Sequence, residues 1–147
     1  MPGLERPDIW KQVTAWHENV YTGSSARGEE RMERLWVGLG GLAGLSGVAL
    51  SAYAAHVLTG PAQSAVNAAI EMQMFHALAL LFVGLWARRG RRITHLAGLA
   101  FTVGIILFCG SIYATHLRSL KLTQFAPAGG MTLMVGWLLL TLSALRR

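Results

Sequence analysis

Four long apolar runs dominate this sequence, and each is long enough to cross a membrane as a helix. The runs cover residues 35–58, about 65–87, 93–117 and about 129–145. A helix needs roughly 20 mainly apolar residues to span ~30 Å of hydrocarbon, where only internal hydrogen bonds can satisfy the backbone. The sequence therefore predicts an all-α integral membrane protein whose transmembrane domain covers residues 35–147.

Short turns separate the four runs. Gly60 and Pro61, the stretch "RRGRR" at 88–92 and the stretch "APAGG" at 126–130 are helix stops or turn signals. Because the connections are short, neighbouring helices must run antiparallel. We therefore expect a four-helix bundle.

A sixty-residue repeat divides the bundle into two halves. The octapeptide "SAYAAHVL" at 51–58 is matched by "SIYATHLR" at 111–118, and Gly38 and Gly44 have counterparts in Gly98 and Gly104. Such matches predict two tandem helical hairpins related by an axis along the membrane normal.

The basic residues lie outside the spans, which indicates loops between membrane helices rather than a nucleic-acid surface. Lys and Arg number five in the first 34 residues, none in the first turn, four at 88–92, two at 118–121 and two at the C-terminus. The positive-inside rule then places both termini in the cytoplasm, or in the matrix or stroma of an organelle. We expect a multi-pass membrane protein that does not bind nucleic acid.

Residues 1–34 form a separate, charged cytoplasmic segment. Ile9, Val13, Trp16 and Val20 recur at helical spacing, and Thr22 with Gly23 is a helix-stop signal. The segment therefore predicts a short amphipathic helix over about 8–22. A helix of this kind lies in the membrane interface or against a partner protein.

Three polar side chains of the second span are candidate site residues. Glu71 is the only acid outside the first 34 residues, and an ionisable group at that depth is a functional candidate unless it reaches water or pairs with Arg118 or Lys121. His76 lies deeper and shares a helix face with Gln73, so we expect it to point inward. It is interpreted as a hydrogen-bonded core residue, with proton relay and haem ligation as alternatives.

Two tyrosine and histidine pairs end the first and third spans at matched depth. Tyr53 with His56 and Tyr113 with His116 suit the aromatic belt at a membrane surface. In the alternative interpretation, His56 and His116 ligate one haem b iron from opposite sides. Cysteine occurs once, which excludes a multi-cysteine metal site, and no metal site is predicted.

The stretch "GLGGLAGLSG" at 38–47 is interpreted as a helix-packing surface. Its glycine spacing resembles a dinucleotide loop, but that loop needs a preceding strand, whereas this stretch lies inside an uncharged span. Small residues near one helix face instead allow a neighbouring backbone to approach closely. The predicted packing residues are Gly40, Gly44, Gly47 and Ser51.

Several motifs in combination resemble a known family. They are "AYAAHVL", "MQMF" followed by "HALALLFVGLW", "CGSIY" and "PAGGMTLMVGWLLL", spread over about residues 36–145. They are similar to those of the YgdD-like family of small four-helix membrane proteins of unknown function, which has a transmembrane relative in animals. The resemblance implies a compact bundle in the bacterial inner membrane and no established activity. Glu71, His116 and the first 34 residues depart from the family pattern.

The sequence offers no catalytic signature, so we expect a protein that is not an enzyme. A serine nucleophile motif, a metal-binding H-E-x-x-H and a phosphate loop are all missing. The favoured function is an accessory or assembly subunit of a membrane complex, or a self-associating bundle, acting through helix packing in the bilayer. One alternative is a haem-binding or proton-handling protein that uses His56, His76, His116 or Glu71, and another is a small-solute transporter.

Overall fold

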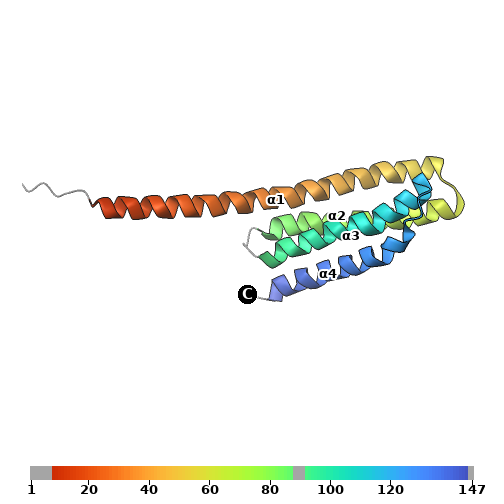
Figure 1. Ribbon diagram of the computed structural model, residues 1–147. Helices are drawn as coiled ribbons and strands as arrows, with labels where there is room; N and C mark the ends of the chain where they lie inside the picture. The colour runs from red at the N-terminus through yellow and green to blue at the C-terminus, as the bar shows by residue number, and fades with distance from the viewer. Residues whose placement is uncertain (1–7, 88–91, 146–147) are drawn as a thin grey trace, which may run out of the picture.

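The computed structural model describes residues 8–87 and 92–145, apart from the side chains of Ala15, Glu29 and residues 17–27. This part of the chain forms four long helices and one short 3₁₀ turn (Figure 1): α1 Ile9–Val57, α2 Gly60–Ala87, α3 Arg92–Arg118, η1 Thr123–Phe125 and α4 Ala126–Leu145. All four contain a segment long and apolar enough to cross a membrane. The predicted all-α membrane bundle is confirmed.

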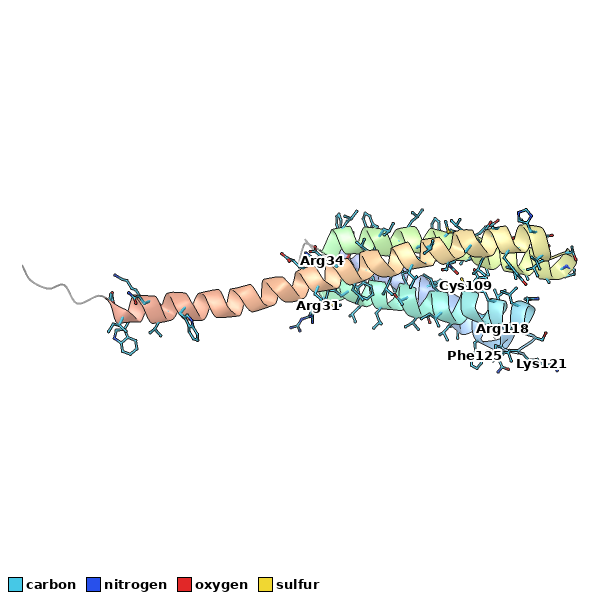
Figure 2. The ribbon with its side chains drawn as sticks, turned by 90° about the horizontal axis from the view of Figure 1, so that it is seen from above. Arg31, Arg34, Cys109, Arg118, Lys121 and Phe125 are labelled. Carbon is cyan, nitrogen blue, oxygen red and sulfur yellow. The ribbon has the colours of Figure 1, made fainter. Side chains whose placement is uncertain are left out.

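Helix α1 is one continuous helix of 49 residues, so the predicted end at Thr22 and Gly23 is wrong. It begins directly after Asp8, as predicted, and at 1.5 Å per residue it is about 73 Å long. Glycine lowers helix stability by only about 1 kcal/mol, whereas proline breaks a helix, and no proline occurs between Asp8 and Val57. As a result the N-terminal part of α1 projects beyond the other three helices (Figure 2).

Two prolines begin helices where the sequence indicated turns. Pro61 and Pro127 each occupy the second residue of their helix, α2 and α4. Proline is tolerated in a first turn because the amide that it lacks would have no partner there. Both helices therefore start a few residues before the predicted spans, and Gly60 makes the tight turn from α1 with a φ of +62°. Of the predicted "RRGRR" turn, residues 88–91 lie outside the described part of the chain.

The helices pack in chain order as two hairpins that meet along α2 and α3. Contacts are most extensive between α3 and α4 and between α1 and α2, and α2 packs on α3. Among the described residues α1 meets α3 only slightly, and α1 and α4 share no extended contact. The bundle is therefore open on one side, with α1 lying outside α2 (Figure 1).

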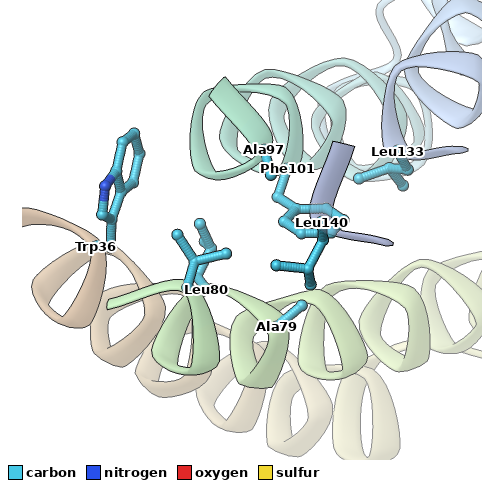
Figure 3. Packing of buried hydrophobic residues seen from close by; sticks show 8 residues of the cluster. Trp36, Ala79, Leu80, Ala97, Phe101, Leu133 and Leu140 are labelled. Carbon is cyan, nitrogen blue, oxygen red and sulfur yellow. The ribbon is translucent and has the colours of Figure 1, made fainter. Parts of the chain in front are cut away.

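Buried side chains from all four helices form the main core (Figure 3). Phe101 lies fully buried between α3 and α4 near Leu133 and Leu140, while Trp36 of α1 packs beside Leu80 of α2. A smaller cluster of Ala54, Val66 and Ile70 fills the opposite end, near the turn between α1 and α2.

Glycines set the closest approach between α3 and α4. A Cβ at Gly136 would lie 2.7 Å from the Phe101 ring, and one at Gly129 would meet the backbone nitrogen of Phe108. Packing of this kind replaces the hydrophobic effect as the force between helices in lipid.

The repeat holds for the pairing of helices but not for the surroundings of the matched residues. Gly98 packs on Trp36 and Gly104 on Leu133, whereas a Cβ at Gly38 or Gly44 would meet nothing within 4 Å. The two halves therefore share a pattern of hairpins, while their matching glycines face different environments.

We predict that Gly129→Ala lowers the free energy of unfolding in mild detergent by about 1–3 kcal/mol, because the added methyl group would overlap rigid backbone at Phe108. The matched control is Gly38→Ala, which adds the same methyl group in open space and gains up to about 1 kcal/mol of helix propensity. Thermal unfolding of both variants in one detergent would measure the difference. Equal stability of the two variants would contradict the packing described here.

Candidate functional site

His76 lies at the centre of the bundle with both ring nitrogens occupied. Its Nδ1 lies 2.7 Å from the backbone oxygen of Met72, and its Nε2 lies 3.1 Å from the indole nitrogen of Trp137 on α4. A carbonyl can only accept and an indole N–H can only donate, so Nδ1 carries the proton and Nε2 accepts. The imidazole is therefore held neutral, and it points inward as predicted.

Aromatic rings surround this imidazole. The rings of Phe75, Phe101 and Trp137 have centroids 5.5, 5.7 and 6.0 Å from that of His76. In this arrangement no nitrogen of His76 remains open to a haem iron. The geometry is that of a residue which ties α2 to α4.

A second bond of the same kind joins α1 to α3. The indole nitrogen of Trp36 donates to Nδ1 of His95 over 2.9 Å, and the two rings stack with centroids 6.3 Å apart. The sequence interpretation missed both residues. Trp36 and His95 are separated by 59 residues and His76 and Trp137 by 61, and nothing in the local sequence indicates which of these side chains meet.

Gln73 ties α2 to α1. Its side chain is buried, and its Nε2 donates to the backbone oxygen of Ala43 over 2.7 Å and to Oγ of Ser46 over 2.8 Å. Gly47 of α1 leaves room beside this contact for the Met74 side chain, because a Cβ at Gly47 would lie 2.6 Å from Sδ of Met74. Gln73 thus acts on the neighbouring helix rather than on His76.

The predicted packing residues of α1 face in two directions. Gly40 and Gly47 face α2, where a Cβ at Gly40 would lie 2.9 Å from the backbone oxygen of Ala77. Gly44 instead looks onto open space, and Ser51 is exposed. The predicted packing surface is therefore divided into a face that α2 covers and a face that no helix of the bundle covers.

Glu71 lies on the outside of α2. Its side chain is exposed, and within the described part of the chain it forms no ion pair with Arg118 or Lys121. It is also separate from His76, which is buried on another face of the same helix.

The two tyrosine and histidine pairs have different surroundings, and the structure does not bring them into one site. Tyr53, His56 and His116 are exposed. The hydroxyl of Tyr113, by contrast, is buried and has no hydrogen-bond partner among the described residues. Nor do the histidines, cysteine and acids of the described residues form any group of three or more that would hold a metal ion.

An apolar groove of about 330 Å³ lies between α1 and α3, with α2 as its floor. Leu42 on α1 and Ile106 on α3 form its walls, and Gln73 and Tyr113 add polar groups. Its lining suits hydrocarbon chains.

We predict that His76 and Trp137 are energetically coupled. Trp137→Phe and His76→Leu should each lower the free energy of unfolding, because each leaves the other side chain without its hydrogen bond. The double variant should lose less than the sum, with a coupling of about 0.5–2 kcal/mol. Unfolding measured in a double-mutant cycle would test this. Trp36→Phe, combined with His76→Leu, is the control and should show no coupling. Coupling as large in that control cycle would refute the assignment.

The sequence is similar to those of known membrane proteins. A family profile described as "Protein of unknown function (DUF423)" matches residues 50–130. A UPF0382 membrane protein of Haemophilus influenzae is 35% identical over 112 residues, which cover 73% of this chain and 90% of that protein. The UPF0382 inner membrane protein YgdD of Escherichia coli is 35% identical over 113 residues, covering 71% and 85%.

A relative from a third organism agrees with these two. A UPF0382 membrane protein of Staphylococcus aureus is 32% identical over 118 residues, which cover 77% of this chain and 97% of the relative. No solved structure gives a significant match. With four membrane-spanning helices and relatives of this similarity and coverage, the chain belongs to the UPF0382 family of membrane proteins.

Proposed function

We propose that this protein is a non-catalytic subunit of an assembly in the bacterial inner membrane and that it acts by packing its helices against other proteins. The observation that carries the proposal is the projection of α1 beyond the bundle (Figure 2). Counted from Ile9 to Glu30, where the membrane-spanning segment begins, this projection is about 32 Å long.

The projecting end of α1 exposes large apolar side chains. Ile9 and Trp10 are 65% and 78% exposed, and Val13 is 40% exposed. In water such exposure is unfavourable by roughly 25 cal/mol per Å² of apolar surface, so these side chains favour a covering surface.

A protein surface fits this end of α1 better than the membrane surface does. An interfacial helix lies in the plane of the membrane, whereas this segment continues the axis of a spanning helix without a proline or any other break. A rigid helix aligned with the span carries its apolar side chains away from the bilayer. We therefore place a partner protein on it.

The interior of the bundle supports the same proposal. The nitrogens of His76 and the amide nitrogen of Gln73 are engaged in bonds between or within helices. The groove between α1 and α3 is lined mainly by apolar residues, which does not favour a path for a polar solute. These polar groups stabilise the packing of the helices. The protein therefore acts on other proteins through the outer surfaces of its helices.

The proposed orientation places both ends of the chain in the cytoplasm. Arg31 and Arg34 lie at one end of the bundle and Arg118 and Lys121 at the other (Figure 2). Helix α3 begins with Arg92 at the same end as Arg31 and Arg34 (Figure 1), so the count of Lys and Arg along the sequence makes this end cytoplasmic by the positive-inside rule.

We expect a membrane-impermeant maleimide to label Lys121→Cys in intact spheroplasts and to label Gln12→Cys only after the membrane is opened. The native thiol of Cys109 is buried and should stay unlabelled in both variants. Labelling of Gln12→Cys from outside would reverse the proposed orientation.

Binding of the partner should depend on Trp10. We predict that Trp10→Ser weakens it by about 2 kcal/mol or more, because an exposed tryptophan at the end of α1 is a typical hot spot. The measurement is quantitative mass spectrometry of proteins that accompany the full chain purified from native membranes in mild detergent.

Gln12→Ser is the control, since it changes an exposed polar residue two positions away without removing apolar surface. A partner retained by Gln12→Ser and lost by Trp10→Ser supports the proposal. An identical set of proteins with both variants, or none with the native chain, would refute it.

A further inference from the structure

Helix α1 has a face that its own bundle leaves uncovered. Gly40 and Gly47 are pressed against α2, but a Cβ at Gly41 or Gly44 would meet nothing within 4 Å. Val48 on the same side is 60% exposed. Glycines inside a membrane helix lower its stability unless a neighbour approaches closely, so this second glycine face indicates a further helix.

The uncovered face has a heptad spacing through the membrane part of α1. Gly41, Gly44, Val48, Ser51 and Ala55 alternate at spacings of three and four, the pattern of a coiled-coil contact line. Val37 precedes them in the same register, at the edge of the contact with Gly84 of α2. The exposed apolar residues Ile9, Val13 and Trp16 fall in the same register, and Trp16 precedes Val37 by three heptads. We call these nine residues, together with Glu30 and Arg34, the α1 seam.

Three surface hollows lie along the seam. A hollow of about 440 Å³ involves Ile9, Val13 and Trp16. One of about 720 Å³ involves Glu30, Arg34 and Val37, and one of about 400 Å³ involves Val48, Ser51 and Ala55. The second and third have α2 as their other wall. A helix lying along the seam would place side chains in all three hollows, as knobs enter holes in a coiled coil.

The repeat identifies what covers the seam. Lipid can cover its membrane part but not Ile9 and Val13, which the proposed orientation places in the cytoplasm. The covering helix must therefore span both membrane and water and keep the same 3.5-residue period, and α1 itself has those properties. Two copies inserted in the same orientation bring their α1 helices together in parallel about a two-fold axis.

The charges on the seam are complementary under that two-fold axis. Glu30 and Arg34 are one helical turn apart, both are exposed, and neither forms an ion pair within the described residues. In a parallel pair of helices the carboxylate of one copy reaches the guanidinium of the other, in both directions at once.

We propose that the α1 seam binds the α1 seam of a second copy of this chain, forming a parallel two-stranded coiled coil that crosses the membrane and extends into the cytoplasm. The inference rests on the proposed function, because it names one partner for a protein that acts by helix packing. Trp10 lies about a quarter turn from the seam and remains available to a different protein.

The test is disulfide cross-linking of the full chain in native membranes, with Cys109→Ser as the background. Val48→Cys and Ala55→Cys lie on the seam and should give a cross-linked dimer. Leu42→Cys is the matched control, because it is 62% exposed on the same helix but faces the groove toward α3. A dimer formed as readily by Leu42→Cys as by Val48→Cys would overturn the inference.

Charge exchange provides a second measurement that does not depend on thiol reactivity. Arg34→Glu should lower the cross-linking of Val48→Cys because it places only acids at the centre of the seam. Adding Glu30→Arg should restore it, since the exchanged charges are again complementary. Failure of the double exchange to restore cross-linking would also overturn the inference.

The two proposals fail separately. Trp10→Ser should abolish partner binding and leave the cross-linking of Val48→Cys unchanged. A chain that retains its Trp10-dependent partner but shows no seam cross-link refutes the dimer alone. A chain that cross-links through the seam but has no Trp10-dependent partner refutes the docking role of Trp10 alone.

Discussion

Hydrocarbon offers no hydrogen-bond partner, and this constraint accounts for most of what the polar residues of the bundle do. A polar side chain inside the membrane must find its partner on another helix or on its own backbone. His76 finds both, through Trp137 on α4 and the backbone of Met72. The two Trp and His pairs join α1 to α3 and α2 to α4, two helix pairs with little direct contact. They add to the packing of α2 on α3, which also connects the two hairpins.

Glycine provides the other source of cohesion. Where helices pack directly, a glycine faces backbone or a side chain of the neighbouring helix, as Gly40 does at Ala77 and Gly129 at Phe108. Lipid tails are as apolar as leucine, so burying leucine between helices gains little, whereas close approach of backbones gains dispersion energy. Between α1 and α2 the two kinds of contact act together, because Gln73 donates hydrogen bonds to α1 beside Gly47.

The sequence was sufficient for the spans, their antiparallel order and the inward position of His76, because these depend on composition and on the helical period alone. The errors have local causes. Gly23 resembled a helix stop. One glycine lowers helix stability by only about 1 kcal/mol, however, and the helix of 49 residues continues through it. Pro61 and Pro127 resembled turns, yet a first turn accepts proline.

The missed pair of Trp36 and His95, by contrast, could not follow from local sequence. It depends on how α1 and α3 are rotated relative to each other, and the two residues are 59 positions apart in the sequence. The same rotation decides that Gly40 and Gly47 face α2 while Gly44 does not. A neighbouring residue is 100° away around a helix, so the sequence locates a small-residue surface more easily than it decides which neighbour uses it.

The length of α1 limits the kinds of contact that can cover its seam. A heptad line drifts by about 20° per heptad around a straight helix, so over the distance from Ile9 to Ala55 it turns by more than a quarter circle. A straight neighbour such as α2 lies beside that line rather than along it: α2 packs on Gly40 and Gly47, which are off the line, and touches the line only at Val37, next to Gly84. A helix that follows the whole line has to coil around α1. Only a partner with the same period over the same length can do so, which is why a second α1 fits the seam better than lipid or a single straight span does.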